Sequence, residues 1–258
     1  MEKTKFQYIY GPVSSWRLGS SLGIDLLSGQ EKICTFDCIY CQVGRKKAVF
    51  PERKVYVPTE KILAEINSLP ELKPDYITFS GKGEPTLALN LGETIKAVKK
   101  IRLEPVAVLT NASLLFRKDV REELCAADLV ALKLDAGSQK TLTLINCPAS
   151  QIHFADIWEN IRHFRKEYPG WLALQLMFMT ENKDEAEQLA KLVREIGPDE
   201  AQINTPTRAA QVKPLTPQEI AVIKQYFQGI NVRACYDALP RKKKDTSARI
   251  GDIKKRRG

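Results

Sequence analysis

The feature of this sequence that most constrains its fold is an alternation of short apolar runs with amphipathic runs. The apolar runs are as long as β-strands and lie at residues 22–27, 75–79, 106–110, 129–134, 171–179 and 201–204, with a further short one at 230–235. The amphipathic runs have apolar residues every three or four positions, as in helices that pack on one face. They lie at residues 59–69, 91–101, 118–126, 157–164, 184–196 and 217–227. Repeated strand–helix units of this length predict a parallel sheet covered by helices.

The chain contains about six such units, enough for an open barrel and too few for a closed eight-fold one. We therefore predict an α/β fold, a partial (β/α)6 TIM-like barrel of parallel strands with helices outside, over residues 1–240. Residues 241–258 are expected to form a flexible basic C-terminal tail. In sheets of this kind the chemistry lies at the carboxyl ends of the strands.

Three cysteines follow the first predicted strand with the spacing C-x3-C-x2-C: Cys34, Cys38 and Cys41. Soft thiolates favour iron–sulfur clusters or zinc over hard cations. A structural zinc site usually has four protein ligands in two pairs, and the only histidines, His153 and His163, are distant in sequence. Three cysteines around a 4Fe–4S cluster leave one iron without a protein ligand, and that iron can bind a substrate or cofactor. The spacing therefore favours the cluster.

A second polar group, Ser-Gly-Lys-Gly-Glu-Pro-Thr at residues 80–86, directly follows the predicted strand 75–79. Gly81 and Gly83 allow the backbone to approach a ligand closely. Glu84 adds a carboxylate suited to binding an ammonium group. Since turns with two glycines are common, this signal becomes strong only together with the three cysteines.

Other polar residues lie at the ends of predicted strands. Asn111 and Asn204 carry short amides suited to ribose or carboxylate contacts, although asparagine is also common in turns. Lys133 and Asp135 are two residues apart, so they point to the same side of a strand. Lys133 is a candidate catalytic residue that could bind a carboxylate or a carbonyl, and Asn111, Asp135 and Asn204 are candidate cofactor contacts. The alternative is a Lys–Asp pair that only orders the strand end.

The cysteine triplet followed by Gly83-Glu84-Pro85 resembles the radical S-adenosylmethionine (SAM) superfamily. The resemblance implies that the three cysteines hold a 4Fe–4S cluster whose open iron binds the amino and carboxylate groups of SAM. It further implies that Tyr40 packs near the adenine and that the segment from Gly81 to Glu84 binds the methionine amino group. Such an enzyme cleaves SAM to a 5′-deoxyadenosyl radical and needs an electron donor such as flavodoxin or ferredoxin.

A narrower resemblance extends over most of the chain. The runs at residues 11–25, 109–115, 132–136 and 202–208 are similar to wyosine-synthase-related radical SAM proteins. The characterised members of that group are tRNA 4-demethylwyosine synthases, which carry a second cluster on three further cysteines before the radical SAM loop. Residues 1–33 contain no cysteine, so we expect a single cluster here.

The charge distribution points to an anionic partner. The chain has a formal net charge of +9, of which the nine Lys/Arg and two Asp of residues 241–258 contribute +7. Such a tail can bind the phosphates of RNA, or it can be a solvated terminus. Together with the family resemblance, it predicts tRNA base modification.

The remaining expectations concern location and rival functions. The amino-terminal residues do not resemble a signal peptide, and no apolar run reaches the roughly 18 residues of a membrane span. We expect a cytoplasmic protein with reduced thiols and no membrane partner. Two alternatives stay open: an activase for a glycyl-radical enzyme, and a non-catalytic zinc-dependent nucleic-acid-binding module.

Overall fold

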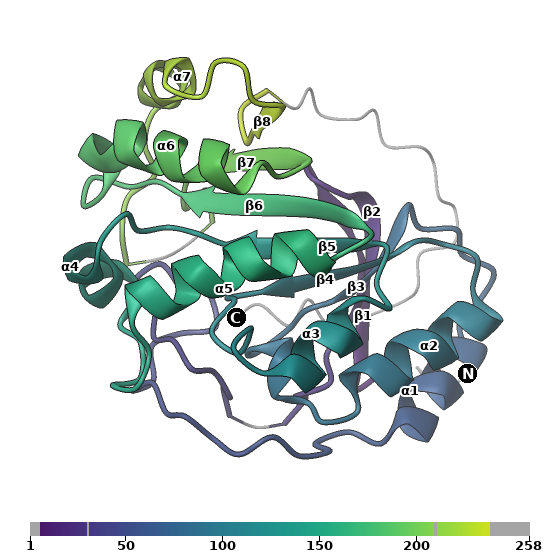
Figure 1. Cartoon of the computed structure of the whole chain (residues 1–258). Coiled ribbons are helices and arrows are strands. Elements are labelled where there is room, and N and C mark those ends of the chain that lie inside the picture. The colour runs from purple at the N-terminus through teal and green to yellow at the C-terminus, as the bar shows by residue number, and fades with distance from the viewer. Residues whose placement is uncertain (1–5, 30, 209–210, 238–258) are drawn as a thin grey trace.

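The computed structural model describes residues 6–29, 31–208 and 211–237, which form a curled eight-stranded sheet with helices along its outer face (Figure 1). The strands are β1 (Ile9–Ser15), β2 (Gly19–Ile24), β3 (Tyr76–Phe79), β4 (Val106–Thr110), β5 (Leu129–Lys133), β6 (Trp171–Met177), β7 (Glu200–Asn204) and β8 (Val232–Ala234). They are ordered β1 to β8 across the sheet. Strand β1 is antiparallel to β2, and every other pair is parallel.

The predicted barrel of six strand–helix units is confirmed. Strands β2 to β7 are followed in turn by the helices α1 (Thr59–Asn67), α2 (Leu91–Ile101), α3 (Lys118–Leu124), α5 (Phe154–Glu167), α6 (Ala186–Ile196) and α7 (Pro217–Gln225). The shorter elements are η1 (Pro85–Leu87), α4 (Gln139–Thr141), the π-helical turn η2 (Leu142–Asn146) and η3 (Lys183–Glu185). The tail at residues 241–258 lies outside the described residues.

Sequence periodicity did not predict the hairpin of β1 and β2. The first parallel strand begins at Gly19, three residues before the predicted start at residue 22. The prediction missed these residues because they are small and polar and show no apolar alternation. The turn between the two strands is stabilised by Ser15, whose Oγ accepts the backbone N–H groups of Arg17 and Leu18, at 3.2 Å each. Gly19 follows with a positive φ of 66°, a conformation that glycine adopts without strain.

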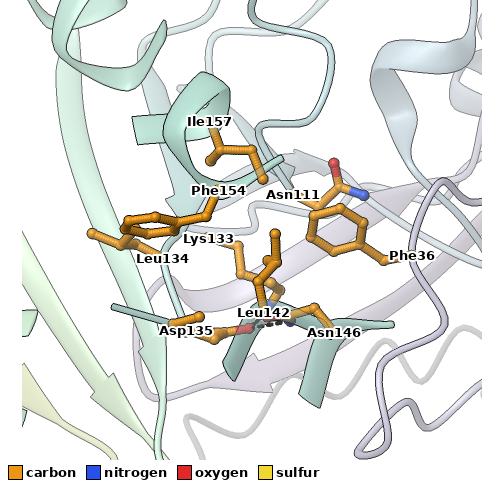
Figure 2. A pocket seen from close by; sticks show the side chains of 10 residues that line it. Phe36, Asn111, Lys133, Leu134, Asp135, Leu142, Asn146, Phe154 and Ile157 are labelled. Atoms are coloured by element: carbon orange, nitrogen blue, oxygen red, sulfur yellow. Dashed lines mark hydrogen bonds and ion pairs between the residues drawn. The ribbon is translucent and has the colours of Figure 1, made fainter. Parts of the chain in front are cut away.

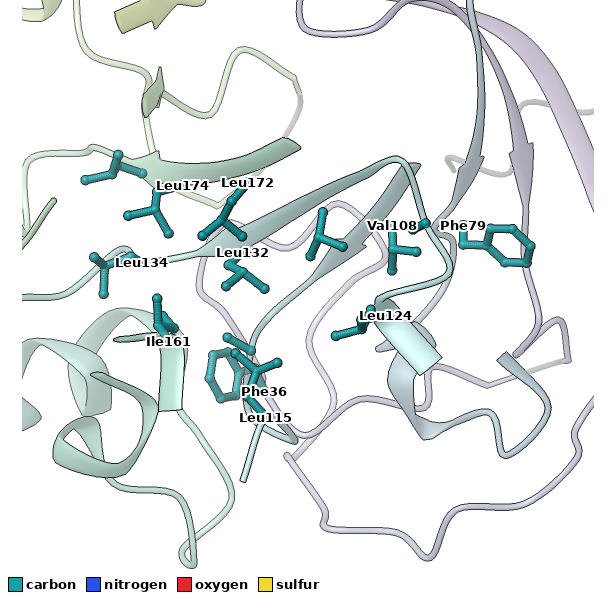
Figure 3. Close-up of a cluster of buried hydrophobic side chains, with 14 of the residues drawn as sticks. Phe36, Phe79, Val108, Leu115, Leu124, Leu132, Leu134, Ile161, Leu172 and Leu174 are labelled. Carbon is teal, nitrogen blue, oxygen red and sulfur yellow. The ribbon is translucent and has the colours of Figure 1, made fainter. Parts of the chain in front are cut away.

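The outer face of the sheet packs against the helices as an apolar layer. Figure 3 shows Leu132 beside Leu172 of the neighbouring strand; both belong to one buried cluster with Ile161 of α5 and with Phe36 of the cysteine loop, the segment that carries Cys34, Cys38 and Cys41. The exposed fraction of these four side chains is 2% or less. Burial on this scale is the main stabilising contribution to such a fold, and it places the cysteine loop against the sheet.

The side chains on the inner face of the sheet are packed at the amino-terminal ends of the strands and partly exposed at the carboxyl ends. At the amino-terminal end, Leu18 of the hairpin turn packs with three alanines and Leu129. Arg233 of β8 donates hydrogen bonds to the carbonyl oxygens of Trp16 and Arg17, at 3.4 and 3.1 Å, and so ties the last strand to this turn. At the carboxyl ends of β5 and β6, Lys133, Gln175 and Met177 are partly exposed. The barrel is therefore filled at its amino-terminal end and open to solvent at the end where the site lies.

Among the described helices, none is both long enough and apolar enough to cross a membrane.

Candidate active site

The cysteine loop, which connects β2 to α1 and carries Cys34, Cys38 and Cys41, is held by the turn after β3 and by residues 145–148 beyond β5. Ile33 forms a parallel β-bridge with Gly83 after β3, and Phe36 forms an antiparallel one with Pro148 in the loop that follows β5. The backbone N–H of Ile39 donates to the carbonyl oxygen of Ile145 at 2.9 Å. These contacts place all three cysteines at the carboxyl edge of the sheet, where the sequence predicted the chemistry.

Gly81 and Gly83 were expected to let the backbone approach a ligand, and in the structure the groups that approach them closely belong to the chain itself. A Cβ atom at position 83 would lie 1.9 Å from the carbonyl oxygen of Ile33, and one at position 81 would lie 2.2 Å from Cγ of Asp25. Real Cβ atoms essentially never come this close to another heavy atom. The glycines therefore let the cysteine loop and the end of β2 pack against the turn after β3.

Glu84 is a buried carboxylate held by uncharged donors. Its Oε1 accepts Thr86 N–H at 3.1 Å, Thr86 Oγ1 at 2.7 Å and Thr110 Oγ1 at 2.5 Å, and its Oε2 accepts Asn111 N–H at 2.7 Å. Burial raises the pKa of Glu84, and these hydrogen bonds oppose the rise. Oε2 accepts a single hydrogen bond, and no cationic side chain is a partner within the described residues. The carboxylate can therefore accept a further, positively charged donor.

Tyr40, Lys133 and Asp135 come together beside the loop. The Tyr40 hydroxyl donates to Oδ2 of Asp135, and Nζ of Lys133 lies 3.6 Å from the same oxygen. Nζ also lies 5.1 Å from the centre of the Tyr40 ring, a cation–π distance. Burial, together with the nearby Asp135, raises the pKa of Tyr40 well above its ordinary value. The Lys–Asp pair considered from the sequence is thus present, and it orients the residue that precedes the third cysteine.

Two asparagines contact the cysteine loop, and only one of them was selected from the sequence. Asn111, which follows β4, lies with its Nδ2 3.7 Å from Cys34 Sγ. Asn146, the last residue of η2, lies with its Nδ2 3.5 Å from Cys38 Sγ. The sequence around Asn146 has no helical or strand periodicity that would have pointed to this residue. It lies at the end of a π-helical turn, just before Cys147 and Pro148. Asn204 ends β7 and is buried, but its side chain makes none of the hydrogen bonds that link the other site residues.

A small pocket lies between the cysteine loop and the ends of β4 and β5 (Figure 2). Its polar lining consists of Asn111, Lys133, Asp135 and Asn146. The apolar lining consists of Phe36, Leu134, Ala136, Leu142, Phe154 and Ile157. The pocket thus brings together residues of the cysteine loop, the ends of β4 and β5, η2 and α5.

The three thiols of the cysteine loop are soft donors of the kind that an iron–sulfur cluster uses, and in the chain alone burial favours the protonated form of two of them. Burial raises the pKa of Cys34 to about 12, with smaller contributions from Glu84 and Cys38, and burial also raises the pKa of Cys38. Metal binding would have to displace these protons. Among the described residues, no three Cys, His, Asp or Glu side chains lie close enough together to hold a single metal ion. The thiolates of an iron–sulfur cluster bind different irons and are therefore more widely spaced.

The remaining cysteines show no comparable arrangement. Cys125 at the end of α3 and Cys235 after β8 are both half-buried, and neither lies at the cysteine loop. Cys147 is partly exposed beside the cysteine loop, with its Sγ 3.5 Å from Nη2 of Arg45.

Comparison with known proteins agrees with this geometry. A UPF0026 protein of Synechocystis sp. is 42% identical over 211 residues, covering 80% of this chain and 77% of the relative. A UPF0026 protein of Methanocaldococcus jannaschii is 36% identical over 229 residues, covering 86% and 70%. The solved structure of Streptococcus suis SuiB bound to S-adenosylmethionine has a similar fold, with a TM-score of 0.60 at 14% identity. That match covers 79% of this chain and 48% of SuiB, so the chain spans about half the length of that protein.

The family model for the radical SAM superfamily matches residues 32–193, which run from the cysteine loop to α6. This range includes all three loop cysteines, the turn after β3 and the polar ends of β4 and β5. Membership implies SAM and an iron–sulfur cluster as cofactors, and it argues against the non-catalytic zinc module. The chain therefore belongs to the radical SAM superfamily and is an enzyme of that family.

Proposed function

We propose that this enzyme holds one 4Fe–4S cluster on Cys34, Cys38 and Cys41 and cleaves SAM to make a 5′-deoxyadenosyl radical that acts on RNA. The cluster would supply the single electron that breaks the sulfonium bond of SAM. The observation that carries the proposal is the position of Glu84, a buried carboxylate beside the cysteine loop without a cationic partner among the described residues.

Glu84 would bind the amino group of SAM through Oε2. A buried negative charge is costly unless a positive charge or several donors offset it. The four uncharged donors around Glu84 keep the carboxylate in place, and an ammonium group would complete its environment. Gly81 and Gly83 would act by letting this turn pack closely against the cysteine loop.

Tyr40, Lys133 and Asp135 would form the other side of the SAM site. The hydrogen bond from Tyr40 to Asp135 holds the aromatic ring in one orientation next to Cys41, so the ring can pack against an adenine. Lys133 could release Asp135 to bind the SAM carboxylate or a substrate carbonyl. The buried Asn204 at the end of β7 would contribute a further polar contact when the cofactor is bound.

For the substrate we propose RNA, most specifically a tRNA base, as in the wyosine-synthase-related group. Support comes from the similarity of residues 11–25, 109–115, 132–136 and 202–208 to that group, and from the +7 charge of residues 241–258. A basic tail binds phosphates with an affinity that falls as salt rises. We further propose a cytoplasmic location and an electron donor such as flavodoxin or ferredoxin.

The first experiment tests the chemistry. Anaerobically reconstituted enzyme should bind about four irons per chain and form 5′-deoxyadenosine when given SAM and a strong reductant. The Cys38→Ala variant should lose this activity, whereas Cys125→Ala, which changes a cysteine far from the loop, should keep it. Stoichiometric zinc without inorganic sulfide in the wild-type protein would refute the proposed mechanism.

The second experiment tests the substrate. Mass spectrometry of tRNA nucleosides from cells with and without the gene should show a modified base that is missing in the deletion. Removing residues 241–258 should weaken RNA binding and flatten its salt dependence. Unchanged nucleosides, together with recovery of a large partner enzyme and no RNA in a pull-down, would favour the glycyl-radical activase instead.

A further inference from the structure

Two buried side-chain amides face two of the three cysteine sulfurs. The Asn111 Nδ2 lies 3.7 Å from Cys34 Sγ, and the Asn146 Nδ2 lies 3.5 Å from Cys38 Sγ. Both distances suit N–H···S hydrogen bonds, and the exposed fractions of the two asparagines are only 6% and 1%. The asparagines come from different segments, one after β4 and the other at the end of η2. Cys34 and Cys38 thus each receive a separate amide donor.

The orientation of the Asn111 amide is fixed by a partner that can only donate. Its Oδ1 accepts the backbone N–H of Ser113 at 3.0 Å, so Nδ2 must point the other way, toward the cysteine loop. Nδ2 carries two hydrogens. One is used by Oγ1 of Thr35 at 2.9 Å, and the second remains for the sulfur of Cys34.

The Asn146 amide is fixed by a partner that can only accept. Its Nδ2 lies 2.8 Å from the carboxylate oxygen Oδ2 of Asp135 and 3.0 Å from the hydroxyl of Tyr40, which itself donates to that carboxylate. One hydrogen is directed at this pair, and the other remains for the sulfur of Cys38. The Asn146 Oδ1 is buried without a hydrogen-bond partner in the described structure. A buried oxygen without a hydrogen-bond donor lowers the stability of the fold. The contribution of this amide to the site therefore comes from its nitrogen.

We propose that Asn111 and Asn146 set the reduction potential of the cluster by donating hydrogen bonds to the thiolates of Cys34 and Cys38. This inference rests on the proposed function, because it needs a cluster on these cysteines. Reduction adds one electron from the external donor and no proton, so negative charge builds up on the cluster and its thiolates. Donors to the sulfurs stabilise the reduced form and raise the potential. The two asparagines are positioning residues that act through the cysteines, and they would keep the cluster within reach of a biological reductant.

The test is a redox titration of the reconstituted cluster followed by electron paramagnetic resonance. Asn111→Leu and Asn146→Leu remove the N–H groups at nearly constant volume. Each should shift the reduction equilibrium about tenfold toward the oxidised form, which lowers the midpoint by about 59 mV for a one-electron couple. The double variant should show a larger shift than either single one. Wild-type midpoints in both single variants would overturn the proposal.

Asn182→Ser serves as the matched control. Asn182 is also buried, and its Nδ2 donates to the carbonyl oxygens of Asp135 and Met177 at 2.8 and 2.9 Å, but none of its hydrogen bonds reaches a cysteine. The midpoint reduction potential of the Asn182→Ser variant should equal that of the wild type. A shift as large as that of Asn146→Leu would overturn the proposal, because it would show that any loss of a buried amide near Asp135 has the same effect.

A second measurement needs no variant and so does not depend on whether one folds. Pulsed resonance spectra of the reduced wild-type cluster, with isotopically labelled asparagine and deuterated solvent, should show couplings to an asparagine nitrogen and to exchangeable deuterium. Spectra without an asparagine coupling would overturn the proposal. Iron content is measured first, so the two failures are distinct: a wild-type protein that binds no cluster refutes the proposed function, whereas a normal cluster with unshifted midpoints refutes this inference alone.

Discussion

Replacing Gly83 by alanine tests whether the cysteine loop must pack against the turn after β3 in order to hold its cluster. A Cβ atom at this position would lie 1.9 Å from the carbonyl oxygen of Ile33 and 2.8 Å from Cδ1 of Leu27. Real Cβ atoms essentially never approach other atoms within 3.0 Å. Because the obstacle is backbone in a close-packed region, the loop has to move away by more than about 1 Å.

This displacement has a cost that can be worked from the structure. It breaks the hydrogen bond of 3.0 Å from the Glu84 N–H to the carbonyl oxygen of Ile33, which contributes about 1 kcal/mol. Overpacking adds about 1–3 kcal/mol, so the free energy of the docked loop rises by about 2–4 kcal/mol in total. Since 1.4 kcal/mol corresponds to a factor of ten, the docked loop becomes about 30- to 700-fold less populated relative to the open one.

The assay is iron and sulfide content after anaerobic reconstitution, followed by the rate of iron loss to a chelator. Gly83→Ala should bind less iron and lose it faster than the wild type. Gly29→Ala is the control, because a Cβ atom there would lie 3.8 Å from its nearest neighbour, an ordinary contact, and it should behave like the wild type. Equal iron retention in both variants would refute the idea that close packing at Gly83 holds the loop.

Three further predictions concern the SAM site, the core and one helix. Glu84→Gln should weaken SAM binding about 10- to 100-fold, because a hydrogen bond to a charged group is lost. Anaerobic calorimetry measures the affinity for SAM, and an unchanged value would contradict the role of Glu84. Arg53→Met should destabilise the protein by about 1–3 kcal/mol, because it removes the donors to the carbonyl oxygens of Thr86 and Ala88. Its carboxylate partners Asp119 and Glu123 are partly exposed and contribute less. Denaturant unfolding without a lower midpoint would count against this prediction. Hydrogen bonds from Thr216 and from Lys183 lower the pKa of Glu219 from 4.5 to about 2, so its stabilising contribution is present above pH 4.5 and disappears as the pH falls toward 2. The melting temperature of Glu219→Gln should accordingly lie below that of the wild type at neutral pH and converge with it in acid, and a constant difference would exclude this linkage.

Local patterns in the sequence predicted most of the architecture, for a clear reason. The helices on the outer face need apolar residues at every third or fourth position, and a parallel strand that is covered by helices needs a short apolar run. Both patterns are local, so residues 91–101 and 106–110 were predicted with the bounds that α2 and β4 have in the structure. The hairpin of β1 and β2 was missed because Gly19, Ser20 and Ser21 are small and polar, so the strand shows no apolar run at its start although it pairs with β1 next to it and with β3.

The residues of the candidate site were likewise predicted from local patterns, whereas their contacts with distant segments were not. The spacing of the cysteines and the Gly83-Glu84 turn were readable from the sequence, because the residue types and their separations carry the chemistry. The partners of these residues were not readable. Asn146 lies 108 positions from Cys38, and the hydrogen bond from Tyr40 to Asp135 spans 95 positions. No local pattern reports such contacts.

The sequence by itself determined which ligands the chain offers to a cluster and which strand ends would lie at the same edge of the sheet. Spacing along the loop and the rule that parallel strands end together are sufficient for both. Only the tertiary structure decided that Gly83 packs against the cysteine loop, that Glu84 is buried among uncharged donors, and that the amides of Asn111 and Asn146 face the sulfurs. These arrangements depend on how distant segments pack, and packing is a property of the folded chain rather than of any short stretch of it.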